Sequence, residues 1–264
     1  YKRKALLALW TPCEFTGKVG YYHFEHYDFF DDVYCVCPFT CRFMNKHFGY
    51  EKFHYIPYPF TNYSVKDFYK YDSDCCWVGS VHGEDHIKAL EVLFDFDYKF
   101  ITTLQNTWMQ HPYEFNKHTH LNLSPENKLI EMSKCKSSLS FNMIYMSPAS
   151  QKNNFDVFDY FDKGIMPQFK VRTHEITSSK SLMLVKKDPW NLVSDFYKPE
   201  KEFIYFETFS ELHERIQDIK SNFDQYKNIV ENAYEKSYNY TVESVYPYIK
   251  TNNKKLITWE NNHV

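Results

Sequence analysis

A cation, a carboxylate and a second cation follow one another in the second half of the chain: Arg172, Glu175 and Lys180. Arginine and lysine bind phosphate oxygens, and a carboxylate accepts hydrogen bonds from vicinal hydroxyl groups. These residue types predict half of a site for a negatively charged, ribose-containing ligand such as a nucleotide-sugar. The spacing of Arg172 and Glu175 also fits a simple ion pair within one helix.

The segment from Gly164 to Asp188 predicts how these side chains are positioned. A loop with Gly164 and Pro167 comes first, a short helix carries the charged residues, and the apolar strand Leu182–Val185 follows. In an open α/β sheet, ligands bind at helix N-termini and at loops beside strand ends. The predicted helix therefore places its charges beside such a loop.

A second segment has the order strand, glycine, loop and helix. The apolar run Cys75–Val78 ends in Gly79 and Ser80, and a helix is predicted from His86 to Phe94 with Lys88 in its early turns. Glycine lets a backbone approach a ligand closely, and backbone N–H groups can then bind a phosphate. For Lys88 and Lys180, the alternative of a solvated helix face stays open.

Candidates for a catalytic base lie near the N-terminus. Glu14 follows the apolar run Ala5–Trp10, at the strand end where α/β folds place chemistry, although an exposed loop carboxylate is the alternative. Further candidates are His23, Glu25, His26 and Asp28. Their spacing matches no metal motif, so we predict neither a metal site nor a cofactor.

Short apolar segments alternate with helical segments along the chain, which favours parallel α/β sheets. Pro57 and Pro59 predict a domain boundary, because proline stiffens the backbone. Strands are predicted at 5–10, 33–37, 52–56, 75–78, 99–103, 138–144, 182–185 and 202–206, and helices at 39–48, 86–94, 125–134, 208–221, 223–238 and 241–250.

Composition narrows the functional classes. The 264 residues carry a formal net charge of -3, which gives no field favouring nucleic acid, and 43% of them are hydrophobic, enough for a core. The seven cysteines form no CxxC pair, and no long apolar span is present. We therefore expect a soluble, cytoplasmic protein. No GxxxxGK[ST] or GxGxxG motif exists, which disfavours a kinase or a dehydrogenase.

From about Tyr71 onward, the order of these parts resembles the donor-binding half of GT-B glycosyltransferases, in particular the C-terminal domain of CgeB-like and group 1 enzymes. No single motif carries this resemblance; the ordered series does, over about two thirds of the chain. The matching segments are Asp74–Ser80, Glu126–Asn142, Arg172–Ile176, Ser181–Val185, Phe196–Tyr205 and Thr208–Leu212.

The resemblance implies an α/β, GT-B-like fold with two Rossmann-like parallel-sheet domains. Residues 1–60 with about 222–264 would form a small or truncated N-terminal acceptor-side domain, with the C-terminal helices packing back onto it. Residues 61–221 would form the domain that binds the nucleotide-sugar. The implied activity is transfer of a hexosyl or pentosyl group from a UDP- or GDP-sugar to a glycan or other hydroxyl acceptor, without a metal ion.

The resemblance also implies roles for individual residues. Glu175 would bind the ribose hydroxyls, and Arg172, with Lys180 or Lys88, would stabilise the charge that develops on the diphosphate. The remaining donor-binding residues implied are Gly79, Ser80, Tyr145, Ser147 and Ser179. We therefore assign catalysis to Glu14 and Arg172.

Two alternatives remain open. Retaining members of the family often carry two glutamates with seven residues between them. Glu175 can be the second of these, but the position of the first is Pro167 here. An exostosin-like or fucosyltransferase-like inverting enzyme is therefore the second choice. A GT-B-like module that binds a sugar or a protein without catalysis is the other. Retention of Arg172 and Glu175 disfavours the module.

Overall fold

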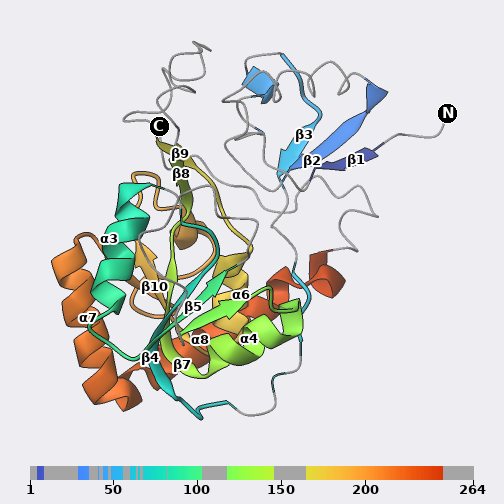
Figure 1. Cartoon of the computed structure of the whole chain (residues 1–264). Coiled ribbons are helices and arrows are strands. Elements are labelled where there is room, and N and C mark those ends of the chain that lie inside the picture. The colour runs from blue at the N-terminus through green and yellow to red at the C-terminus, as the bar shows by residue number, and fades with distance from the viewer. Residues whose placement is uncertain are drawn as a thin grey trace. The chain divides into compact units, whose positions relative to one another are not determined.

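The computed structural model describes residues 5–8, 29–35, 41, 44–46, 49–55, 60–63, 65, 68–81, 83–102, 118–145 and 165–245. The chain divides into two compact units (Figure 1). The first unit comprises Tyr1–Pro59, Asn142–Phe169 and Val242–Val264, and the second comprises Phe60–Phe141 and Lys170–Thr241. None of the described helices is long and apolar enough to cross a membrane.

A six-stranded sheet forms the centre of the second unit, in the order β11-β10-β7-β4-β5-β6. Every pair of neighbouring strands in it is parallel, which confirms the predicted α/β class. The strands are β4 (Ser73–Val78), β5 (Tyr98–Thr102), β6 (Thr119–Leu121), β7 (Cys135–Ser140), β10 (Leu182–Lys186) and β11 (Ile204–Phe206).

Helices cover both faces of this sheet (Figure 1). They are α3 (Glu84–Leu93), α4 (Pro125–Ser133), α6 (Arg172–Ser178), α7 (Phe209–Asn222) and α8 (Lys227–Ser237). Helices α3 and α7 contact each other, while α6 contacts both α4 and α8. Strands that are covered on both faces must be apolar on both, and this explains the buried run from Cys75 to Val78.

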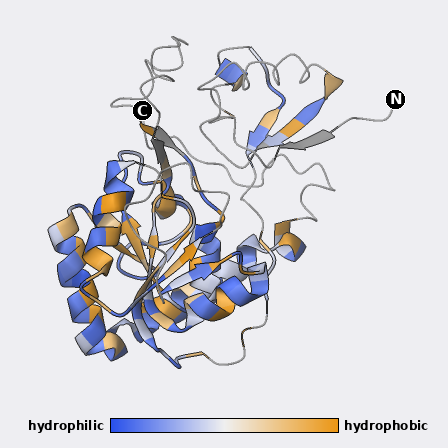
Figure 2. Ribbon diagram, in the orientation of Figure 1, coloured by the Kyte–Doolittle hydropathy of each residue, from blue (hydrophilic) through white to orange (hydrophobic). Residues whose placement is uncertain are grey.

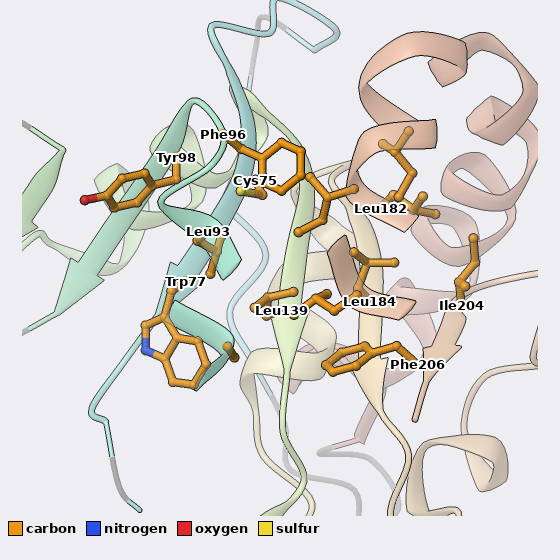
Figure 3. Packing of buried hydrophobic residues seen from close by; sticks show 14 of the residues in the cluster. Cys75, Trp77, Leu93, Phe96, Tyr98, Leu139, Leu182, Leu184, Ile204 and Phe206 are labelled. Atoms are coloured by element: carbon orange, nitrogen blue, oxygen red, sulfur yellow. The ribbon is translucent and has the colours of Figure 1, made fainter. Parts of the chain in front are cut away.

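The core of the second unit lies between the sheet and the helices α3 and α7. Trp77, Leu139, Leu184 and Phe206 come from neighbouring strands and point toward the same interior (Figure 3). Apolar residues are concentrated on the strands, and polar residues cover the outer faces of the helices (Figure 2). Burial of this apolar surface is the main stabilising contribution to the sheet that carries the candidate site.

Two predicted helix starts are confirmed by hydrogen bonds. The Ser124 hydroxyl accepts a hydrogen bond from the N–H of Asn127 at 3.2 Å, and Pro125 occupies the first helical position of α4. The Thr208 hydroxyl accepts one from the N–H of Glu211 at 3.1 Å, so Thr208 caps α7.

The predicted single strand from Ser138 to Ile144 is wrong, because two strands share this segment. Strand β7 ends at Ser140, and β8 (Met143–Tyr145) pairs antiparallel with β9 (Ile165–Pro167) in a separate two-stranded sheet. Strand β9 also occupies part of the predicted loop that contains Pro167. Pairing with a segment far along the chain separates β8 from the six-stranded sheet.

The first unit contains a three-stranded parallel sheet, in the order β1-β2-β3. Its strands are β1 (Ala5–Ala8), β2 (Asp32–Cys35) and β3 (Phe53–Tyr55), and they lie within or overlap the strands predicted there. Val33, Cys41, Met44 and Phe53 form its described core.

Residues 222–241, which the sequence analysis placed in the N-terminal domain, belong to the second unit. Helix α8 contacts α6 and β10, and it buries Val230, Ala233 and Ser237. Conversely, residues 142–169 belong to the first unit, which the sequence analysis limited to the two ends of the chain.

Candidate functional site

Polar groups converge at the carboxyl edge of the six-stranded sheet. Strand β4 runs into Gly79 and Ser80, while α4 and α6 each precede a strand and therefore begin at this same edge. Ligands of open parallel sheets bind at the carboxyl ends of the strands. Gly79, Arg172 and Glu175 are thus placed where the fold allows a binding site.

The Arg172 guanidinium lies directly against Gly79. A methyl group at Gly79 would overlap Nη2 of Arg172, and would lie 2.6 Å from Cζ and 2.9 Å from Nη1. Gly79 also has a φ of +110°, a conformation that residues with a side chain rarely adopt. Glycine is required here for both reasons, and the space it leaves is filled by a cation.

Arg172 is charged but has no hydrogen-bond partner among the described residues. Its side chain is half-buried, and its Nε atom is buried without a partner. Burial lowers the pKa of the Arg172 guanidinium, and the nearby Glu175 carboxylate acts in the opposite direction. Arginine nevertheless stays protonated in proteins. Removing a cation from water without a partner is costly in free energy, so this half-buried side chain is suited to receive an anion.

Glu175 forms an ion pair with Lys128 of α4 rather than with Arg172. Lys128 Nζ lies 2.6 Å from Oε1 of Glu175, and the two side chains are 24% and 13% exposed. Lys128 is not among the residues predicted from the sequence. The order of the elements could have identified it. Lys128 and Glu175 each lie in the first turns of a helix that precedes a strand of the parallel sheet, so both lie near the same edge.

The backbone of Gly79 is not free to bind a phosphate, in contrast to the sequence expectation. Its N–H donates to the carbonyl of Ile101 at 2.7 Å, which continues the pairing of β4 with β5. Its carbonyl accepts a hydrogen bond from Nε1 of Trp77 at 3.0 Å. Gly79 therefore contributes space for Arg172, and Ser80 is the half-buried residue that follows it at the edge.

Lys180 lies at the opposite edge of the sheet. It precedes β10, and Leu182 and Cys75 both pair with Ser137, so Lys180 is level with the start of β4. Along the strands, this is about 20 Å from Gly79. Lys180 cannot join Arg172 at one diphosphate, because Arg172 begins α6 and Lys180 lies beyond the opposite end of this helix.

Contacts at this opposite edge explain Lys180 structurally. Its Nζ lies 2.8 Å from both carboxylate oxygens of Glu231 and 4.3 Å from the centre of the Tyr234 ring. The neighbouring Ser179 is buried, and its hydroxyl donates to the carbonyl of Ile176 at 2.8 Å. Both residues join α6 to the sheet and to α8, away from Arg172.

Lys88 lies on the surface of α3. It forms an ion pair with Glu84 at 2.6 Å, and the side chains are 47% and 77% exposed. Such exposed pairs contribute little to stability. This is the solvated helix face that the sequence analysis kept as the alternative.

The other predicted residues belong to the first unit or lie outside the described residues. Tyr145 ends β8, which belongs to the first unit. Ser147 and Glu14 lie outside the described residues, as do the further base candidates His23, Glu25, His26 and Asp28. Within the described ranges, no group of three or more His, Cys, Asp or Glu side chains could hold a metal ion.

Asp188 is a buried carboxylate that follows β10 at the carboxyl edge. Its Oδ1 accepts hydrogen bonds from the N–H groups of Trp190 at 2.9 Å and Leu192 at 3.3 Å, while Oδ2 has no partner among the described residues. Burial raises the pKa of Asp188 to about 6, from the ordinary value of 3.8 for an aspartate. Its charged form is therefore disfavoured in the folded protein.

We expect stability to fall as the pH rises through 6. The folded protein holds the Asp188 proton more tightly than the unfolded chain, so this contribution is complete below pH 3.8 and is lost above 6. Between pH 5 and pH 7.5 the loss is about 1–2 kcal/mol. Urea unfolding of wild type and Asp188→Asn at these two pH values measures this loss in the free energy of unfolding. Asp97→Asn, at an exposed carboxylate, is the control, and equal slopes for all three proteins would contradict the assignment.

Comparison with known proteins places this arrangement in a family. A family model described as glycosyl transferase-like matches residues 87–245, which include every described residue of the carboxyl-edge site except Gly79 and Ser80. No curated protein matches the chain in sequence.

Solved structures of glycosyltransferases share the fold. HepE from Anabaena in complex with UDP-glucose is 10% identical, with a TM-score of 0.64 over 95% of this chain and 72% of that one. A TarM mutant from S. aureus, in complex with fondaparinux, α-GlcNAc-glycerol and UDP, is 13% identical, with a TM-score of 0.61 over 94% of this chain and 50% of that one.

Sucrose-phosphate synthase from Thermosynechococcus elongatus is 11% identical, with a TM-score of 0.57 over 86% of this chain and 58% of that one. Of the structures compared, TarM is about twice as long as the part of it that this chain matches, so the chain spans about half the length of TarM. The likeness confirms the predicted GT-B-like fold. Because the family model matches more than half of the 264 residues, the chain belongs to the glycosyl transferase-like family.

Proposed function

We propose that this chain takes part in moving a sugar from a nucleotide-sugar to a hydroxyl group of a glycan or another acceptor. The observation that carries the proposal is the guanidinium of Arg172, which is held against Gly79 without a hydrogen-bond partner among the described residues. Glu175 lies on the same helix, one turn further on.

Arg172 supplies the charge that the reaction needs. When the bond between sugar and diphosphate breaks, negative charge develops on the departing phosphate oxygens. A guanidinium offers several N–H donors in a planar fork, which matches phosphate geometry. In this proposal Arg172 takes the role that a metal ion has in other transferases, so added EDTA leaves the activity unchanged.

Glu175 supplies an acceptor for the ribose. Residues three positions apart on a helix share a face, so Arg172 and Glu175 project from the same side of α6. In a nucleoside diphosphate, the ribose hydroxyls and the phosphates are likewise only a few bonds apart, so neighbouring side chains can bind both. The pair therefore suits a nucleotide, with the phosphates at Arg172 and the ribose at Glu175.

Two solved structures guide the choice of donor. The HepE structure holds UDP-glucose and the TarM mutant structure holds UDP. We therefore propose a UDP-sugar first and a GDP-sugar second. Glu14 is our candidate for the catalytic base, with His23, Glu25, His26 and Asp28 as the further candidates.

A panel of UDP-, GDP- and TDP-sugars tests the donor class. We expect calorimetry to detect binding of one nucleotide, and hydrolysis of the corresponding sugar donor. In Glu175→Gln, binding of that nucleoside and of its diphosphate should weaken about tenfold, because the carboxylate bond to the ribose is lost. Inorganic pyrophosphate, which has no ribose, should bind Glu175→Gln no more weakly than wild type.

The matched control is Glu214→Gln, at an exposed glutamate of α7, which should leave every affinity unchanged. If no nucleotide in the panel binds, the proposed function is wrong. If a nucleotide binds but no donor is hydrolysed or transferred, a sugar-binding module without catalysis is favoured instead.

A further inference from the structure

The spacing of Arg172 and Glu175 would normally join the two residues in an ion pair. Opposite charges three positions apart on a helix attract each other, and an arginine so paired has fewer donors left for a ligand. Here no hydrogen bond links them: Glu175 is paired with Lys128, which is separated from it by 47 residues, and Arg172 keeps its donors.

The contact of Lys128 with Glu175 is well defined. Lys128 Nζ lies 2.6 Å from Oε1, and no described residue donates to Oε2. Both side chains are largely covered, which strengthens the attraction relative to an exposed pair such as Lys227 and Asp224, at 48% and 89% exposure. Helices α4 and α6 are also in contact, so the two partners are held by rigid elements.

We propose that Lys128 is a positioning residue that holds Glu175 away from Arg172. This inference rests on the proposed function. One carboxylate oxygen is occupied by Lys128, the other stays open to a ribose hydroxyl, and the guanidinium stays open to the diphosphate. Lys128 also offsets the negative charge of Glu175, so that the three side chains together keep one net positive charge toward an anion.

Removing Lys128 should therefore disable Arg172 indirectly. In Lys128→Met, the Glu175 carboxylate loses its partner, and the nearest remaining cation on its own helix is Arg172. The new intrahelical pair competes with the anion. This loss of affinity requires Glu175. A direct contact between Lys128 and a phosphate would not require Glu175, so the two explanations can be distinguished.

Inorganic pyrophosphate is the probe, because it tests the cation without the ribose. We expect pyrophosphate to bind Lys128→Met about tenfold more weakly than wild type, and Lys128→Met/Glu175→Gln to recover affinity to within about threefold. Lys128→Arg, which keeps a cation able to reach a carboxylate, should bind like wild type.

Two controls isolate the effect. Lys227→Met removes the same charge from an exposed pair and should change pyrophosphate affinity by less than about twofold. Measurements at low and high salt separate net charge, which salt screens, from local pairing, which it screens less. Thermal unfolding of each variant establishes that it is folded.

The outcomes separate the inference from the proposed function. If wild type binds neither pyrophosphate nor any nucleotide, the proposed function fails. If wild type binds and Lys128→Met binds equally well, the positioning role is wrong. If the double variant stays as weak as Lys128→Met, Lys128 contacts the anion itself, and the inference is overturned while the proposed function stands.

Discussion

Arg172→Met should weaken binding of the nucleoside diphosphate by more than about 100-fold, since two charge-assisted hydrogen bonds of about 1.5–3 kcal/mol each are lost. Affinity for the nucleoside alone, measured by the same calorimetry, should change little, because the ribose is assigned to Glu175. The comparison of nucleoside with diphosphate therefore locates the phosphates, which an overall loss of binding would not.

Stability should change in the opposite direction. The Arg172 side chain is half-buried, and its Nε has no partner among the described residues, so the folded protein bears part of the cost of removing this cation from water. Methionine has a similar length and no charge. We expect the midpoint of thermal unfolding of Arg172→Met to be higher than that of wild type.

Arg215→Met is the matched control. Arg215 lies on α7, where its Nη2 contacts Glu211 at 3.3 Å. Its replacement should change neither affinity nor, to any large extent, stability. If Arg172→Met binds the diphosphate as tightly as wild type, Arg172 does not bind the phosphates, and the proposed function loses its main support.

Local signals in the sequence predicted much of the second unit. Apolar runs such as Cys75–Val78 must be strands covered on both faces, and cap residues such as Ser124 and Thr208 determine where helices begin. These features depend on residues close together in the chain. The alternation of strands and helices then predicts a parallel sheet, and the structure has one.

Contacts between distant segments were not predictable in the same way. Lys128 and Glu175 are separated by 47 residues, and nothing in either segment identifies the other as its partner. Strand β8 was merged with the end of β7 because no proline or glycine interrupts the sequence between them, and the pairing of β8 with β9 shows that they are separate strands. Helix α8 is amphipathic, but amphipathicity does not indicate which unit the helix contacts.

The position of Lys180 illustrates what topology adds to spacing. Residues at the start of α6 lie at the carboxyl edge of the sheet, and the residue that follows this helix lies at the other edge, because the helix runs antiparallel to the strands. Arg172 and Lys180 are thus separated although they are close in sequence. The prediction that both residues bind the diphosphate used only their residue types. It did not take into account the direction in which the chain runs between them.

Gly79→Ala should weaken diphosphate binding and also destabilise the fold. The added methyl group would overlap Nη2 of Arg172, and the φ of +110° is strained for alanine. The guanidinium is the flexible end of its side chain, so we expect it to move, which weakens diphosphate binding by about tenfold. The backbone strain, at about 1–3 kcal/mol, should lower the free energy of unfolding. Calorimetry and urea unfolding measure the two effects.

Gly49→Ala separates strain from displacement of the arginine. Gly49 also has a positive φ, of +66°, but no atom lies within 4 Å of the position that a methyl group would occupy. Gly49→Ala should therefore also lower the free energy of unfolding, and it should leave diphosphate binding unchanged. If Gly79→Ala loses stability but binds as wild type does, the closeness of Gly79 and Arg172 has no role in anion binding. A binding loss confined to Gly79→Ala would instead assign this glycine to the placement of Arg172.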